Sequence, residues 1–261
     1  MAEILYAFFI EVLSVLGVIA GGGFLISLCN KAFYKNVGSG AKAICYVTGV
    51  FGVPVHELSH ALFCVLFGHK IVEIKWFQIG DDGTLGYVIH TYNKKNPYQR
   101  IGNFFIGIAP ILGISAVLYL IALWLIPATI GSVTQGIGAI GGQKGFGGLL
   151  GVYFSTIGRF FVGAGNYRWW LFLLVGSAFA LHMNLSSADV KGALSGLAFV
   201  LIALLIVDVI LRVIGGKSAL YGAMRVMLVG GVFIAIFLTL ALVVNLFMLL
   251  LSFLARLIKR R

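Results

Sequence analysis

Long apolar runs, separated by short polar stretches, dominate the chain. A run of about 20 residues is what an α-helix needs to cross the hydrocarbon core of a bilayer. Six runs approach or exceed this length, the fourth being the shortest: residues 4–28, 43–68, 101–126, 169–183, 192–214 and 232–254. The pattern therefore predicts an all-α polytopic membrane protein with about six transmembrane helices.

The most polar stretch, residues 70–99, follows the second run and has a different pattern. Residues 71–77 are rich in β-branched and aromatic side chains, Asp81-Asp82-Gly83 is a turn signal, and residues 85–90 can run back as a second strand. We expect a small β-hairpin or sheet at the membrane surface after the second span. Residues 128–168 are rich in glycine, and their pattern leaves a re-entrant segment, an interfacial helix and an extramembrane loop open.

Composition points to the same class of protein. The chain is 61% hydrophobic and 10% charged, against about 45–50% and 25% in soluble domains, and its mean hydropathy is +1.06. The net charge of +11 fits basic residues that flank spans and face anionic lipid head groups. No basic segment is interleaved with aromatic residues in a polar context. We therefore expect the lipid bilayer, and not nucleic acid, as a partner.

The cysteines and the N-terminal residues argue against three further interpretations. The three cysteines lie in apolar stretches without a C-x-x-C pair, which argues against a disulfide framework and against a thiolate zinc site. Residues 1–6 contain no Lys or Arg, so the first apolar run is expected to be a span and not a cleaved signal peptide.

Basic residues also predict an orientation. Six spans put both termini on one side, together with the hairpin. That side is rich in Lys and Arg, at Lys70, Lys75, Lys94, Lys95, Arg100, Arg256, Lys259, Arg260 and Arg261. Cytoplasmic loops are enriched in Lys and Arg, so we expect the termini and the hairpin to be cytoplasmic.

The second run contains the motif His56-Glu57-Leu58-Ser59-His60. On a helix, residues four apart lie on one face, so two imidazoles can bind one Zn²⁺ there while Glu57 serves as general base. The composition gives about 0.001 such matches by chance. Charged residues at membrane depth are costly and usually mark function, which strengthens the assignment of His56 and His60 as metal ligands and Glu57 as a catalytic residue.

Two histidines are too few for a catalytic zinc site, which usually has three protein ligands. The remaining candidates at membrane depth are Glu11, His182, Asp189 and Asp208. Asp208 has Arg212 one turn later, which predicts a local ion pair. Asp189 lies in a polar break after the fourth run, and we favour it as the third ligand, with His182 as the alternative.

Several segments resemble the site-2 protease family of intramembrane zinc metalloproteases. They are Val53-Pro54-Val55-His56-Glu57-Leu58-Ser59-His60-Ala61-Leu62, Gly68-His69-Lys70, Gly86-Tyr87-Val88 and Ile108-Ala109-Pro110-Ile111-Leu112-Gly113, and Asp189 lies where the family has an aspartate. The resemblance covers residues 43–195. It implies one Zn²⁺ per chain and hydrolysis of a transmembrane segment that unwinds near the zinc. The hairpin would pair with an extended substrate by strand addition.

The expected organisation has three parts. Residues 1–42 form the first transmembrane helix and a loop, 43–195 a catalytic core, and 196–261 the C-terminal helices and a basic tail. The expected function is that of an intramembrane zinc metalloprotease acting on a transmembrane protein substrate. The alternatives are a zinc-bearing membrane scaffold without proteolysis and, with less support, a transporter. An accessory membrane protein or a second copy of the chain is a further expected partner.

Overall fold

The fold was analysed in a computed structural model that describes residues 1–38, 40–79, 83–139 and 146–259. Helices make up most of it, with one two-stranded sheet. The first long rod consists of α1 (Ala2–Val12), a π-helical turn (Leu13–Gly17) and α2 (Val18–Val37). The remaining elements are α3 (Gly40–Leu66), β1 (Lys70–Lys75), β2 (Tyr87–Thr91), α4 (Pro97–Leu125), α5 (Pro127–Gly138), α6 (Phe146–Val162), α7 (Tyr167–Ala180), α8 (Ser187–Ile214) and α9 (Gly216–Lys259).

Five helical segments of the described chain are long and apolar enough to cross a membrane: Ala2–Val37, Lys42–Leu66, Pro97–Leu125, Ser187–Ile214 and Gly216–Leu254. These suggest a membrane protein. The expected count of six is not confirmed. The fourth expected span corresponds to α7, whose 14 residues rise only about 21 Å at 1.5 Å per residue, less than the roughly 30 Å of the hydrocarbon core.

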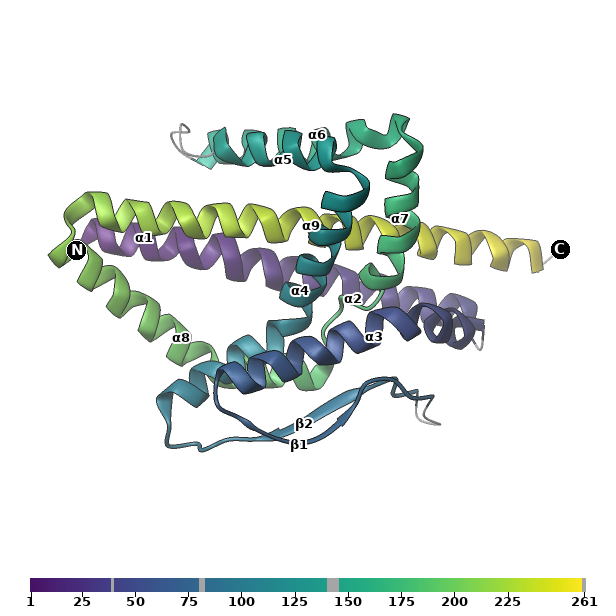
Figure 1. Ribbon diagram of the computed structural model, residues 1–261, viewed down its shortest axis with the longest axis horizontal. Coiled ribbons are helices and arrows are strands. Elements are labelled where there is room, and N and C mark those ends of the chain that lie inside the picture. Colours follow the sequence, from purple (N-terminus) through teal and green to yellow (C-terminus); the bar gives the residue numbers. More distant parts are fainter. Residues whose placement is uncertain (39, 80–82, 140–145, 260–261) are drawn as a thin grey trace.

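Helix α4 is the centre of the fold. It packs against α3, α5, α7, α8 and α9, and it carries the fully buried Ile111, Ile114 and Leu118. Helices α4 and α7 run between the α5–α6 pair and α3, whereas the α1–α2 rod and α9 lie side by side along the long axis (Figure 1). The hydrophobic core therefore surrounds one helix that contacts most of the others.

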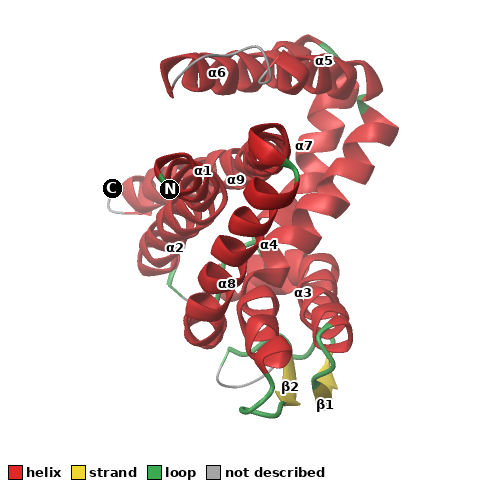
Figure 2. Ribbon diagram, turned by 90° about the vertical axis from the view of Figure 1, so that its left-hand side faces the viewer, coloured by secondary structure: helices red, strands yellow, loops and turns green. Residues whose placement is uncertain are grey.

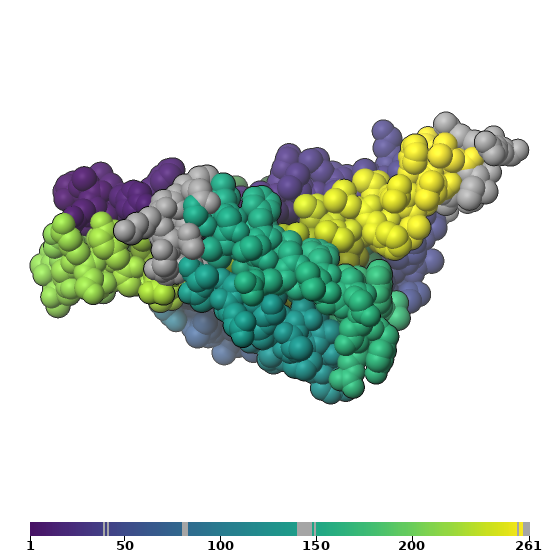
Figure 3. Space-filling model, turned by 90° about the horizontal axis from the view of Figure 1, so that it is seen from above, coloured from purple at the N-terminus to yellow at the C-terminus, as the bar shows by residue number. Residues whose placement is uncertain are grey.

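Residues 128–168, left open by the sequence, form two helices. Helices α5 and α6 pack against each other at the opposite end of the molecule from the sheet (Figure 2). Seen from above, they cover the middle of the surface, and the end of α9 extends beyond them (Figure 3).

The expected β-hairpin is confirmed. Strands β1 and β2 pair antiparallel, with Ile74 opposite Val88 and an irregularity between Ile71 and Glu73. The expected turn residues Asp81 and Asp82 lie outside the described residues. The hairpin starts immediately after α3, because Gly68 adopts a positive φ of 68° that only glycine tolerates readily. This sharp exit holds the sheet beneath α3.

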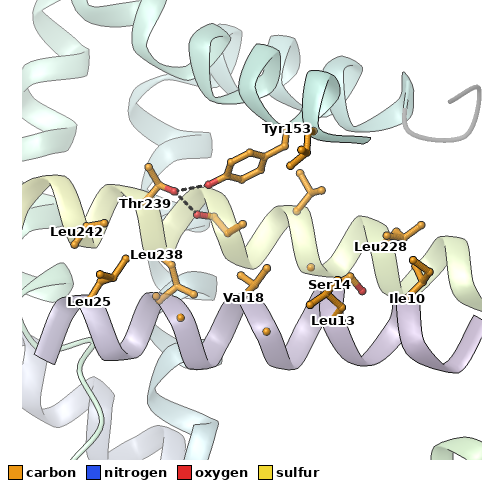
Figure 4. Close-up of a pocket in the computed structure, with 17 residues that line it drawn as sticks. Ile10, Leu13, Ser14, Val18, Leu25, Tyr153, Leu228, Leu238, Thr239 and Leu242 are labelled. Carbon is orange, nitrogen blue, oxygen red and sulfur yellow. Dashed lines mark hydrogen bonds between the residues drawn. The ribbon is translucent and has the colours of Figure 1, made fainter. Parts of the chain in front are cut away.

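A large apolar cavity lies away from the sheet. It has a volume of about 490 Å³ and lies between the α1–α2 rod, α6 and α9. Its polar groups are hydroxyls: Tyr153 and Thr239 are hydrogen-bonded at 2.9 Å, and Thr239 also donates to the Ala235 carbonyl (Figure 4). Among the residues described as lining it there is no carboxylate, imidazole or thiol, so hydrolytic chemistry is not expected there.

Candidate metal centre

Helix α3 brings the two motif histidines together as expected. The His56 and His60 rings have centroids 5.0 Å apart, and their Nε2 atoms are 3.3 Å apart. Both side chains point away from the side of α3 on which Leu58 and Leu62 are exposed. The two imidazoles therefore meet inside the protein, between α3, α4 and α8.

Backbone carbonyls from two other segments fix the orientation of both rings. Nδ1 of His56 is 2.9 Å from the His182 carbonyl oxygen, and Nδ1 of His60 is 2.8 Å from the Ile106 carbonyl oxygen. A carbonyl can only accept, so each Nδ1 carries the proton and each neutral ring has a bare Nε2. This is the tautomer that metal-binding histidines adopt when their second nitrogen donates to a backbone carbonyl.

Asp189 completes the group from the first turn of α8. Its Oδ1 is 3.2 Å from Nε2 of His60, and its Oδ2 is 3.9 Å from Nε2 of His56. Ser186 caps the helix: its backbone N–H donates to Oδ2 of Asp189, and its hydroxyl accepts from the Asp189 N–H. The polar segment that follows the fourth run thus contains the start of α8, earlier than the expected fifth span, and its capping box holds the carboxylate in place.

Close packing of α4 on α8 brings this carboxylate within reach. A Cβ at Gly107 would lie 2.4 Å from the backbone oxygen of Asp189 and 2.6 Å from the backbone nitrogen of Ala193. Only glycine allows this approach, because any side chain there would collide with the α8 backbone. The same stretch of α4 supplies the Ile106 carbonyl, so one helical turn positions two of the three candidate ligands.

The donor set fits a zinc ion. His56, His60 and Asp189 offer ligand atoms that all lie within 4.8 Å of one another. Nitrogens bound at about 2.0–2.1 Å to a tetrahedral zinc would lie about 3.3 Å apart, which matches the observed Nε2 separation. Two bare nitrogens this close repel each other, and a carboxylate beside them adds negative charge. A bound cation would stabilise all three.

Glu57 lies beside this group and faces a cavity of about 240 Å³. The cavity is lined by the three candidate ligands, Glu57, residues of the hairpin and parts of α4 and α8: His56, Glu57, His60, Gly86, Tyr87, Val88, His90, Asn103, Ile106, Gly107, Ser186, Ala188, Asp189 and Gly192. The predicted general base and the predicted ligands therefore share one cavity that is large enough for several non-hydrogen atoms of a substrate.

The other sequence candidates lie elsewhere. His182 contributes its backbone carbonyl to His56, but its side-chain Nε2 is hydrogen-bonded with Thr48 Oγ1 at 3.0 Å and lies outside the ligand group. Glu11 is buried in α1, and no hydrogen-bond partner is recorded for its carboxylate. Neither side chain is placed to serve as the third ligand in this arrangement.

The predicted ion pair between Asp208 and Arg212 is wrong. Arg212 Nε pairs with Glu3 Oε2 at 3.1 Å, and Lys217 contacts the same carboxylate. The Asp208 carboxylate is fully buried and has no hydrogen-bond partner among the described residues. The reason is that Arg212 faces the start of α1, where an acidic side chain is available near solvent, whereas Asp208 faces the helix interface.

Sequence reasoning missed three polar residues of the cavity region. His90 lies on β2 and Asn103 on α4, and both line the cavity, while His69 contacts His90 from the end of α3. The alternation of β2 carried a signal, because Val88 and His90 share one face of a strand. Asn103 lies one turn before Gly107 on α4, but the sequence gave no reason to orient that turn toward the metal ligands.

Fold and site together define a helical protein, suited to a membrane, with a candidate metal centre of the H-E-x-x-H type. A family model described as "Putative zincin peptidase" matches residues 49–141. The matched segment contains His56, Glu57 and His60, the hairpin and α4, and it ends before Asp189. No curated protein and no solved structure matched the chain. The family match supports a zinc metallopeptidase, and zinc is the metal that such a family implies.

Proposed function

We propose that the protein is an intramembrane zinc metalloprotease of the site-2 protease type. The observation that carries this proposal is the pair of bare Nε2 atoms on His56 and His60, facing the Asp189 carboxylate with Glu57 in the same cavity. His56, Glu57 and His60 lie in α3 and Asp189 lies in α8, and both helices are long and apolar enough to cross a membrane. The substrate would be a membrane-spanning or membrane-proximal polypeptide.

Each side chain has a distinct role in this proposal. His56, His60 and Asp189 hold the zinc, which when bound lowers the pKa of a water molecule and polarises the substrate carbonyl. The Glu57 carboxylate takes one proton from the attacking water as the new C–O bond forms. It then gives that proton to the amide nitrogen as the C–N bond breaks, so the products are a carboxylic acid and an amine.

The hairpin provides a way to hold an extended substrate. Gly86, Tyr87 and Val88 line the cavity, and β2 is paired with β1 on one edge only among the described strands. An exposed strand edge offers backbone donors and acceptors to a polypeptide added as a further strand. A transmembrane helix has its amides shielded by internal hydrogen bonds, so this proposal requires the substrate to unwind at the hairpin.

Metal content and cleavage, measured on the same preparations, test the proposal. The full chain is purified in detergent, loaded with zinc and reconstituted with a panel of single-span reporter proteins. His56→Ala and Asp189→Ala should lose zinc and cleavage together. Glu57→Gln should keep stoichiometric zinc and lose cleavage by at least about 100-fold, the lower range for a general base.

A matched control is Glu73→Gln, because Glu73 is an exposed carboxylate on β1 that only accepts a hydrogen bond from Tyr87. It should keep both zinc and cleavage. Zinc binding with no cleavage of any reporter by the wild type would favour a zinc-bearing scaffold. Cleavage that survives Glu57→Gln would refute the assigned role of Glu57.

A further inference from the structure

A second pair of histidines borders the metal cavity. His69, just after α3, and His90, on β2, have Nδ1 atoms 3.0 Å apart and ring centroids 5.0 Å apart. His90 lines the cavity that contains Glu57 and the candidate ligands, but it lies outside the ligand group itself. The proposed function above gives this pair no role.

His69 is held rigidly. Its side chain is buried with 5% exposure, its ring stacks on Tyr92 with centroids 5.1 Å apart, and its Nε2 is 2.8 Å from the Gln99 carbonyl oxygen. Because that carbonyl can only accept, Nε2 of His69 carries the proton. In the neutral ring, Nδ1 of His69 is then an acceptor.

This fixes the proton of His90. The contact at 3.0 Å is a hydrogen bond only if Nδ1 of His90 donates to Nδ1 of His69. Nε2 of His90 then carries no proton, and none of the described residues forms a hydrogen bond with it. This series of hydrogen bonds, from the Gln99 carbonyl through His69 to His90, therefore ends in the Nε2 lone pair of His90, a residue that lines the cavity.

The His90 ring stays neutral under ordinary conditions. Burial, together with the neighbouring His69 and His60, lowers the pKa of His90 to about 4. Burial also lowers the pKa of His69, against the opposing effect of its hydrogen bond to Gln99. A neutral imidazole with this tautomer can accept a hydrogen bond from a ligand but cannot donate one through Nε2.

A peptide supplies the matching donor. The cavity wall that carries His90 also carries Gly86, Tyr87 and Val88, so a polypeptide extended along β2 would present backbone N–H groups to this wall. We propose that His90 contacts the substrate, with Nε2 accepting a hydrogen bond from one backbone N–H near the scissile bond, and that His69 is a positioning residue that fixes its tautomer. The inference rests on the proposed function and adds a selectivity: proline, which has no N–H, is disfavoured at that substrate position.

Binding of metal-directed ligands tests this without turnover. The probes are a dansyl-labelled tripeptide hydroxamate and analogues in which one amide at a time is replaced by an ester, with acetohydroxamate as the probe of the metal alone. Dissociation constants are measured by fluorescence and competition on the zinc-loaded full chain in detergent. Wild type, His90→Phe, His90→Gln and the control Ile89→Phe are compared, since Ile89 is an exposed neighbour on the same strand.

In the wild type, one ester replacement should weaken binding about three- to tenfold, as expected for one hydrogen bond. His90→Phe should abolish that difference, and His90→Gln should restore part of it, because a Gln side-chain oxygen can accept. Acetohydroxamate affinity and zinc content should be the same in all variants. His69→Phe should reduce the difference and convert His90 to a mixture of tautomers, seen by ¹⁵N NMR of the imidazoles.

Contrary outcomes separate the two proposals. A difference between amide and ester that persists in His90→Phe would overturn the role of His90 and leave the peptidase assignment intact. If no ester replacement changes the affinity of the wild type, the role of His90 is likewise overturned and the peptidase assignment stays intact. Loss of zinc or of acetohydroxamate binding in His90→Phe would also overturn it, by making His90 part of the metal site. If the tripeptide hydroxamate binds the wild type no better than acetohydroxamate, the cavity is not a peptide site, and both proposals fail.

Discussion

Substitution of Gly107 by alanine should weaken zinc binding without touching any ligand. A Cβ at this position would lie 2.4 Å from the Asp189 backbone oxygen and 2.8 Å from the Ala193 Cβ. Nonbonded contacts of carbon are favourable at about 3.5–4.0 Å, so α8 must move away from α4 by roughly 1 Å. The separation between His60 Nε2 and Asp189 Oδ1, now 3.2 Å, would then approach about 4 Å, well beyond the roughly 3.3 Å that separates two donors on a tetrahedral zinc.

The expected loss of zinc affinity is about 10- to 100-fold, the range found when residues that hold metal ligands in place are changed. Overpacking at the helix interface should also lower the free energy of unfolding by about 1–3 kcal/mol. Zinc affinity is measured by competition with a chromophoric chelator, and stability by thermal unfolding of the metal-free and zinc-loaded proteins in the same detergent.

Gly192→Ala is the matched control, because a Cβ at Gly192 would meet no atom within 4 Å although the residue lies on α8 near Asp189. It should bind zinc as the wild type does. A folded Gly107→Ala protein with unchanged zinc affinity would refute the argument that the α4–α8 distance sets the position of the Asp189 carboxylate.

Two further predictions concern the cap of α8 and the histidine pair. Ser186→Ala should lower stability by about 1 kcal/mol through loss of the N-cap. It should also reduce zinc affinity, because the Asp189 backbone N–H loses its acceptor and the first turn of α8, which carries the carboxylate, is held less firmly. The exposed Ser187→Ala is the control, and equal zinc affinities would contradict this. For pH, the folded pKa of His90 is about 4 and its ordinary value 6.5, so the unfolded chain binds the additional proton between these values. His90 therefore contributes a stability that is present above about pH 6.5 and is lost as the pH falls toward 4. Between pH 7 and 4.5, the melting temperature should fall less in His90→Phe than in the wild type. Equal decreases in the two proteins would argue against this contribution of His90.

The sequence was most informative where side-chain identity alone determines chemistry. His56, Glu57 and His60 were found from spacing, and Asp189 from a charge in a polar break; the structure brings all four to one cavity. The hairpin was predicted from β-branched and aromatic residues on either side of a turn. In each of these cases, a short stretch of sequence favours one local structure or one kind of chemistry over the alternatives.

Other features depend on contacts that leave no local pattern. The carbonyls of Ile106 and His182 orient the ligand rings, but any residue has a carbonyl, so no residue type marks them. The pairing of Arg212 with Glu3 joins residues 209 positions apart and overrides the local i, i+4 expectation. The short α7 resembled a span because its residues are apolar, but its 14 residues are too few to cross the hydrocarbon core.

The hydrogen bonds to the two ligand rings have a consequence for biogenesis. His56 and the carbonyl that orients it are 126 residues apart, and Asp189 follows later still. A nascent chain that has inserted only its first three helices holds both motif histidines and Glu57, yet it has neither ring fixed and no third ligand. In the proposed protease, hydrolytic competence would therefore arise only once α8 packs on α4 and brings Asp189 to the two histidines.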